Sequence, residues 1–174
     1  MSTATAIPLS DAAARVRVLV LDVDGVLTDG RLYYGARGEA LKAFHVRDGL
    51  GLKLLAAAGI KLAVISGRRS SMTGRRCREL GVGHLLQGVE DKLAAFHRLR
   101  ARLGVTCDAC ACVGDDLADV PLMREVGLSF AVADAHPQAR NAAHLVTQLP
   151  GGQGAVREVC DFLLDARRGA AAAI

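Results

Sequence analysis

Short apolar runs alternate along the chain with longer stretches in which apolar and charged residues recur at helical spacing. Residues 16–21 predict a buried strand, and similar runs follow at 60–67, 84–88, 109–116, 128–134 and 144–147. Helices are predicted over 48–59, 70–81, 91–104, 120–127, 136–143 and 155–168, with Asp48 capping the first of them and Gly59 ending it. Strands that alternate with helices in this way predict a doubly wound (Rossmann-like) α/β fold with a parallel sheet.

One segment interrupts the alternation. Residues 32–44, "LYYGARGEALKAF", predict a small β-hairpin insertion after the first strand, with Gly35 and Gly38 at its turn. The spacing from Asp24 to Ser66 leaves room only for this hairpin and one helix, so no cap domain is expected. We predict a flexible amino terminus over residues 1–14, one domain over 15–165 and a frayed tail over 166–174.

Composition narrows the class of protein. Of the 174 residues 51% are hydrophobic but only 3% aromatic, so the core must consist of Ala, Val, Leu and Ile. The net charge is +4, yet the arginines are scattered and aromatic residues for base stacking are scarce, so nucleic-acid binding is not expected. No apolar run approaches the ~20 residues of a membrane span, and the first residues lack a secretory signal pattern. We therefore expect a cytoplasmic protein without a membrane partner.

The five cysteines include a C-x-x-C spacing at Cys107 and Cys110. A zinc site would need a second pair of ligands, which the neighbouring sequence lacks. Because Cys110 and Cys112 lie in a predicted buried strand, we interpret them as small apolar core residues.

Polar side chains stand where predicted strands end. In a doubly wound sheet the carboxyl ends of the strands meet at one edge, where ligands bind. Taken singly, each residue has an ordinary structural explanation as a turn, a helix cap or a surface lysine. Taken together they form a set that can converge: Asp22, Asp24, Ser66, Lys92, Asp115, Asp116 and Asp119.

This set suits phosphoryl transfer. Carboxylates at Asp22, Asp24 and Asp115 make an oxygen-rich site of the kind that Mg²⁺ prefers. Ser66 and Lys92 can donate to phosphate oxygens. One carboxylate can attack phosphorus, and a second can protonate the leaving alkoxide and later activate water.

The segments "DVDGVLTDG", "ISGR", "QGVEDK" and "GDDLADVP", in that order, resemble the four motifs of the haloacid dehalogenase superfamily of phosphatases. The resemblance implies that Asp22 is the nucleophile and Asp24 the general acid/base. It further implies that Mg²⁺ is held by Asp22, Asp115 and the backbone carbonyl of Asp24. Ser66 and Lys92 would hold the phosphoryl group, and Asp116 and Asp119 would support the site.

Three more segments, "GEALKAFHVRDGLGLKLL", "VGLSFAVADAHP" and "GGQGAVREVCDFLL", resemble a subgroup that acts on the phosphate of an eight-carbon sugar acid. The subgroup implies a homotetramer in which the tail of one subunit helps to close a neighbouring site. It also implies substrate contacts at Asp24, His45, Val46, Arg47, Asp48, Gly49, Lys53, Arg68, Arg76 and Lys92, although Arg76 could equally belong to a solvated helix face. The chain departs from the common pattern at Ser66, His45 and Gln153, where Thr, Asn and Arg are usual.

Three alternatives stay open. A signalling receiver domain uses similar groups, but its lysine follows its other motifs, whereas Lys92 precedes "GDD". A non-catalytic assembly module would not need the complete set of catalytic residues. A phosphatase for a nine-carbon sugar-acid 9-phosphate would keep the chemistry and change the substrate.

Overall fold

The computed structural model describes residues 8–172 and the side chains of residues 8–170. Six parallel strands form the central sheet, in the spatial order β5–β4–β1–β6–β7–β8. Their bounds are β1 Val18–Leu21, β4 Lys61–Ser66, β5 His84–Gln87, β6 Cys110–Gly114, β7 Leu128–Ala131 and β8 Leu145–Val146. From the central strand β1 the chain builds the sheet first toward β5 and then toward β8, which confirms the predicted doubly wound fold.

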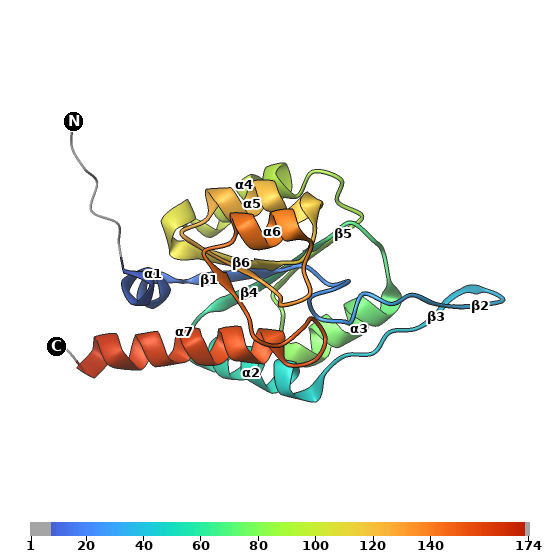
Figure 1. The fold of residues 1–174 in the computed structure, drawn as a ribbon, viewed down its shortest axis with the longest axis horizontal. Helices are drawn as coiled ribbons and strands as arrows, with labels where there is room; N and C mark the ends of the chain where they lie inside the picture. The colour runs from blue at the N-terminus through green and yellow to red at the C-terminus, as the bar shows by residue number, and fades with distance from the viewer. Residues whose placement is uncertain (1–7, 173–174) are drawn as a thin grey trace.

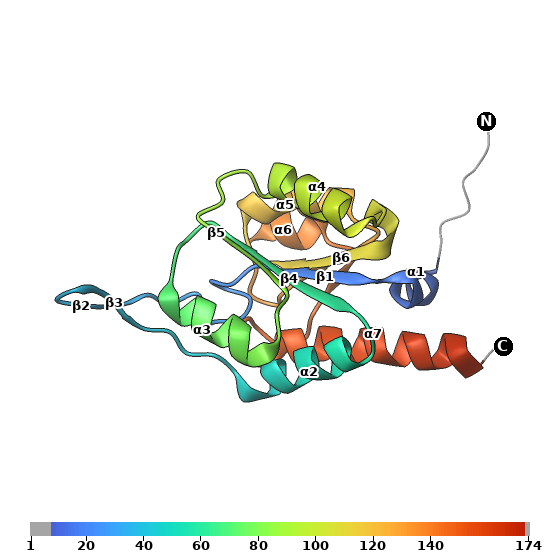
Figure 2. The same cartoon turned by 180° about the vertical axis from the view of Figure 1, so that it is seen from behind.

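Helices cover both faces of this sheet (Figures 1 and 2). On one face lie α4 (Lys92–Leu103), α5 (Val120–Glu125) and α6 (Pro137–Ala142), and on the other lie α2 (Val46–Ala57), α3 (Ser71–Leu80) and α7 (Ala155–Ala172). A strand buried on both sides needs apolar residues at every position, and all four residues of β1 are buried. Short 3₁₀ turns, η1 (Cys107–Ala109) and η2 (Leu117–Asp119), flank β6.

The predicted hairpin is also confirmed. Strands β2 (Tyr33–Gly35) and β3 (Gly38–Leu41) pair antiparallel in a separate sheet. The hairpin projects from the body of the molecule on the side opposite both ends of the chain (Figure 1). It exposes Tyr34 and Leu41 by 66% and 48%, so these residues bury little apolar surface within this chain.

The ends of the domain differ from expectation. Helix α1 occupies Leu9–Arg15, where a flexible terminus was predicted, because Ala13 and the following Val16 are fully buried. Helix α7 continues to Ala172, past the predicted start of a frayed tail, since an alanine-rich segment has high helix propensity. The same predictions for residues 1–7 and 173–174 lie outside the described residues.

Two smaller predictions concern individual residues. Helix α2 begins at Val46 after the N-cap His45, so the prediction that Asp48 caps it was wrong. Cys110 and Cys112 are buried in β6, as predicted for core residues. No helix of the described chain is both long enough and apolar enough to cross a membrane.

The late turns of α7 contact the end of α2, and this contact can be tested. The Arg167 Nη1 group donates to the carbonyl of Ala58, the C-cap of α2, whereas Arg168 pairs only with Asp165 on its own exposed surface. We expect Arg167→Ala to lower the free energy of unfolding by about 0.5–1.5 kcal/mol, because the helix-end carbonyl loses its partner. Arg168→Ala should change it by less than about 0.5 kcal/mol. Urea denaturation measures both, and equal effects would contradict a specific role of Arg167.

Candidate active site

The carboxyl ends of β1, β4 and β6 surround a small cavity of about 180 Å³. It lies where the chain order reverses, since β1 pairs with β4 on one side and with β6 on the other. The cavity is lined by Asp22, Asp24, Ser66, Gly67, Arg68, Lys92, Asp115, Asp116, Ala118 and Asp119. The fold therefore brings together the residues that the strand-end pattern singled out.

The loop after β1 requires glycine at one position. Gly25 has a φ of +95°, and a Cβ there would lie 2.0 Å from Asp115 Oδ2. Inside the loop, Thr28 Oγ1 accepts hydrogen bonds from the amides of Gly25 and Gly30, at 3.4 and 3.2 Å. The backbone after Asp24 thus packs directly against the carboxylate of Asp115.

Lys92 joins two of the acids. Its Nζ lies 2.9 Å from Asp22 Oδ1 and 2.7 Å from Asp119 Oδ1, and the residue is only 6% exposed. The second oxygen of Asp119 accepts from the amides of Asp115 and Asp116, at 3.1 and 3.3 Å. Asp119 therefore connects the lysine at the start of α4 to the loop after β6.

Negative charge exceeds positive charge around Lys92. Burial raises the pKa of Asp22 to about 6, although the charge of Lys92 acts in the opposite direction. Burial, together with the charges of Asp22 and Asp119, raises the pKa of Asp115 to about 8. Burial by itself would lower the pKa of Lys92, but the carboxylates of Asp22 and Asp119 raise it. A further cation at this point would stabilise the ionised carboxylates.

The same acids offer ligands for that cation. One carboxylate oxygen from each of Asp22, Asp115 and Asp119 lies within 4.8 Å of the other two. Both oxygens of Asp119 already have partners, which leaves Asp22 and Asp115 as the better ligands. An all-oxygen donor set of this kind fits Mg²⁺.

The side chain of Asp24 faces other cations. Lys42, at the base of the hairpin, pairs with Asp24 Oδ1 and lies 3.2 Å from Glu39 Oε1. Arg68 Nε lies 3.6 Å from Asp24 Oδ2, and its Nη2 lies 3.1 Å from Glu39 Oε1. Burial would raise the pKa of Glu39, but hydrogen bonds from Ser70 and Lys42 lower it. The general acid/base predicted from sequence is therefore held in a network of charges.

The sequence analysis missed Lys42 and Glu39. Glu39 lies in β3 and Lys42 directly follows this strand, and the side chain of Lys42 is only 2% exposed. A lysine in a hairpin is usually solvated, so the spacing of the motifs gave no reason to select it. The one feature of the sequence that could have indicated them is that Glu39 and Lys42 are interspersed with apolar residues in the second half of the hairpin segment.

A second group of predicted residues does not line this cavity: His45, Val46, Arg47, Asp48, Gly49, Lys53 and Arg76. Val46 is 79% exposed, and Arg47 lines a separate cleft. Arg76 lies against Gly49 and over the ring of Phe44, at 6.0 Å from its centroid. Within this chain these residues lie on α2, directly before it or, for Arg76, on α3, and their contacts with substrate stay predictions.

The side chain of Asp48 lies within the fold. The residue is 2% exposed, and its carboxylate accepts a hydrogen bond from the backbone amide of Arg157, at 2.8 Å. The side chain points into the contact between α2 and α7, and its contact with substrate stays a prediction.

Comparison with known sequences agrees with this geometry. The haloacid dehalogenase-like hydrolase family matches residues 86–156. The 3-deoxy-D-manno-octulosonate 8-phosphate (KDO 8-phosphate) phosphatase of Yersinia pestis is 53% identical over 152 residues, which are 87% of this chain and 81% of that protein.

Solved structures share the fold. The KDO 8-phosphate phosphatase of Moraxella catarrhalis, crystallised with a magnesium ion, a phosphate ion and KDO, has a TM-score of 0.90 and 43% identity, with 94% of each chain covered. A cobalt-bound form of the corresponding phosphatase from Haemophilus influenzae has a TM-score of 0.88 and 45% identity, covering 90% of this chain and 92% of that one.

The charge balance at Lys92 predicts how metal affects stability. Lys92→Met would leave Asp22 and Asp119 without their shared cation, and removing one member of a buried ion pair costs about 3–5 kcal/mol. We expect a lower melting temperature without Mg²⁺ and a larger stabilisation by added Mg²⁺ than in the unmodified protein. Differential scanning fluorimetry with and without Mg²⁺ measures both effects.

Arg98→Met is the matched control, because it removes one positive charge from an exposed position of the same helix. It should leave the melting temperature and its response to Mg²⁺ nearly unchanged. A similar response in both variants would contradict the charge-balance argument.

Proposed function

The chain belongs to the KDO 8-phosphate phosphatase family of haloacid dehalogenase-like hydrolases, and we propose that it hydrolyses KDO 8-phosphate to KDO and inorganic phosphate. One observation carries the chemistry: the carboxylate of Asp22 faces the cavity 2.9 Å from a buried lysine, with the carboxylate of Asp24 two residues away. The reaction would supply the free sugar acid for lipopolysaccharide precursor synthesis.

In the proposed mechanism an oxygen of Asp22 attacks phosphorus and forms an aspartyl-phosphate. The bond between phosphorus and the sugar oxygen breaks, and Asp24 gives its proton to the leaving alkoxide. Asp24 then takes a proton from water as the water attacks the aspartyl-phosphate, which releases phosphate and restores the Asp22 carboxylate. Lys92 and Ser66 line the cavity where the transferred group would lie and can donate to its oxygens.

Asp22 and Asp115 would hold Mg²⁺ together with the backbone carbonyl of Asp24. When bound, the metal neutralises negative charge on the phosphoryl group and so reduces its repulsion by Asp22. The excess of carboxylates over cations around Lys92 supports this assignment.

We propose Arg68 as a contact for the sugar acid. Its guanidinium lies at the mouth of the cavity, 36% exposed at the side chain, beside Asp24 and Glu39. A substrate carboxylate could replace Glu39 as its partner, since arginine binds carboxylates through two parallel hydrogen bonds.

We also propose a homotetramer in the cytoplasm, with the exposed apolar hairpin as the contact surface. The described chain places no other domain over the cavity, so cover must come from another copy or from the substrate itself. Light scattering should give the mass of a tetramer, and a monomer that is fully active would contradict this arrangement.

The principal test is phosphate release from a panel of sugar phosphates. We expect KDO 8-phosphate to have the highest kcat/KM, with activity lost in excess chelator and restored by Mg²⁺. A higher kcat/KM for a nine-carbon sugar-acid 9-phosphate would show that this compound, and not KDO 8-phosphate, is the preferred substrate.

Asp22→Asn should reduce kcat by at least about a thousandfold, because an amide oxygen is a poor nucleophile toward phosphorus. The melting temperature should change little, since Asn keeps the size of the side chain and can still accept from Lys92. Turnover close to normal in this variant would contradict the covalent mechanism.

Arg68→Ala separates recognition of the sugar acid from catalysis. We expect kcat/KM to fall by roughly tenfold to a hundredfold for KDO 8-phosphate, the size of a lost charge-assisted contact. The loss for p-nitrophenyl phosphate, which has no carboxylate, should be much smaller. Equal losses on the two substrates would place Arg68 at the transferred phosphoryl group instead.

A further inference from the structure

A buried acid lies outside the cavity and takes no part in the proposed chemistry. Asp48 is 2% exposed, and its Oδ2 atom has no hydrogen-bond partner among the described residues. Burial raises the pKa of Asp48, while the backbone amides of Arg157 and Gly154 act to lower it. Burying a carboxylate is costly unless hydrogen bonds or a paired charge compensate it, so the hydrogen bonds of Asp48 identify its role in the fold.

Those hydrogen bonds hold the first turn of α7. The Gly154 carbonyl accepts from the Glu158 amide at 3.1 Å, so Gly154 occupies the N-cap position and has no side chain to accept from the free amides. Asp48, from the first turn of α2, supplies the missing acceptor to Arg157. The cap of α7 thus comes from a residue 109 positions earlier in the chain.

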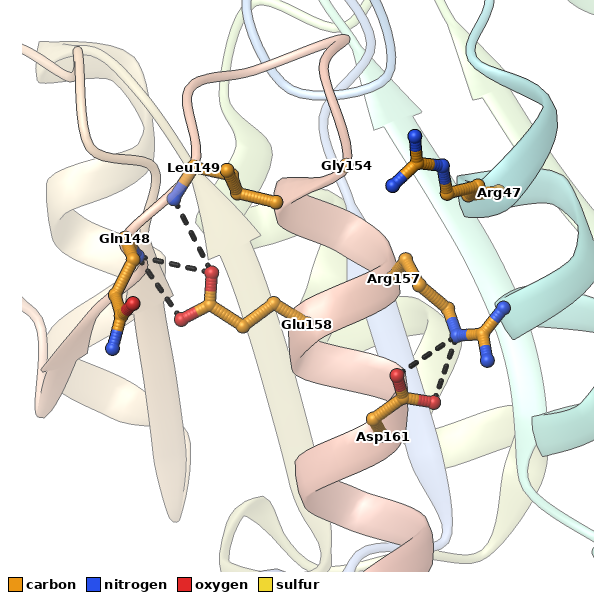
Figure 3. Close-up of a pocket in the computed structure, with 7 residues that line it drawn as sticks. All are labelled: Arg47, Gln148, Leu149, Gly154, Arg157, Glu158 and Asp161. Carbon is orange, nitrogen blue, oxygen red and sulfur yellow. Dashed lines mark hydrogen bonds and ion pairs between the residues drawn. The ribbon is translucent and has the colours of Figure 1, made fainter.

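The segment before α7 is fixed at its other end as well. The Glu158 carboxylate accepts from the amides of Gln148 and Leu149, at 3.0–3.3 Å (Figure 3). The amide of Gly151 donates to Asp134 Oδ1 at 2.9 Å. Residues 150–154, which we call the glycine turn, are therefore held between two carboxylates on one side and Asp48 on the other.

The glycine turn packs backbone to backbone on the loop that carries Asp24. The amide of Gly152 donates to the carbonyl of Val26 at 2.9 Å. A Cβ on Gly151 would lie 1.7 Å from the carbonyl oxygen of Gly25, and one on Gly152, where φ is +65°, would lie 2.4 Å from the amide nitrogen of Asp29. These glycines serve close packing within this chain.

A continuous set of contacts thus runs from Asp48 to the site. Asp48 caps α7, α7 positions the glycine turn, and the glycine turn lies against Gly25. Gly25 in turn lies against the Asp115 carboxylate and follows Asp24 directly. A shift of the turn by a fraction of an ångström would move the acid/base or the proposed metal ligand.

We propose that Asp48 is a positioning residue, which holds Asp24 and Asp115 in place by capping α7 and so seating the glycine turn on the loop after β1. The proposal rests on the proposed function in that Asp24 is taken as the acid/base. It assigns Asp48 no contact with substrate.

The experiment compares Asp48→Ala with Asp48→Asn. Asparagine keeps an oxygen that can accept from the Arg157 amide, whereas alanine removes the cap. For Asp48→Ala we expect kcat to fall by about tenfold or more on both KDO 8-phosphate and p-nitrophenyl phosphate, with KM changed by less than about threefold, because the reacting groups and not the substrate contacts are displaced. Asp48→Asn should recover most of kcat.

Val159→Ala is the control for lost stability. It removes buried apolar atoms from the same helix, and a valine side chain takes no part in the hydrogen bonds of the cap or the turn. If Asp48→Ala and Val159→Ala have similar melting temperatures and similar kcat at a temperature well below both, Asp48 is only structural and the proposal is overturned. A loss confined to KM for the sugar phosphate would also overturn it, in favour of a substrate contact.

Hydrogen exchange tests the proposal without any activity. Amides in residues 25–30 should exchange faster in Asp48→Ala than in Asp48→Asn or Val159→Ala. If the unmodified protein does not hydrolyse KDO 8-phosphate, the proposed function fails. Faster exchange in Asp48→Ala would then still support the positioning role. Unchanged exchange and unchanged kcat would overturn the positioning role alone.

Discussion

Three carboxylates, those of Asp22, Asp115 and Asp119, lie close together beside one buried ammonium group, and this imbalance of charge governs the site. Lys92 neutralises one negative charge and fixes the orientation of two acids. The remaining negative charge raises the pKa of Asp115, after burial itself. A further cation would reduce the repulsion between these carboxylates and a dianionic phosphate, so the metal would favour substrate binding as well as the chemistry.

The backbone around these carboxylates is also held from outside. At Gly25 and Gly151 two loops meet without side chains, so no flexible group can absorb a movement of either one. Core packing of α7 against α2 is thereby transmitted to the site through backbone contacts. This explains how a helix at the end of the sequence can affect a loop near its beginning.

The sequence predicted those features that depend on local pattern. Apolar runs located the strands, and the acids at their ends converge because parallel strands share a carboxyl edge. Lys42 could not be predicted, since its burial depends on where the hairpin leaves the body. The hydrogen bond of Asp48 to Arg157 could not be predicted either, because a motif does not show that a carboxylate faces a residue 109 positions away in the chain. Cap and pairing residues depend on tertiary packing, which local spacing does not encode.

The hairpin shows how a chain without a cap domain can still control its acid/base. It supplies Lys42 and Glu39, which hold Asp24 and Arg68, and its two strands also expose Tyr34 and Leu41. The charged residues act within each copy, whereas the exposed apolar residues are covered only if another surface packs on the hairpin. Such a contact would restrain β3, which carries Glu39, and Lys42, which follows it. Assembly and acid/base chemistry would then be coupled through two strands, with no residue of the neighbour needed at the reacting phosphorus.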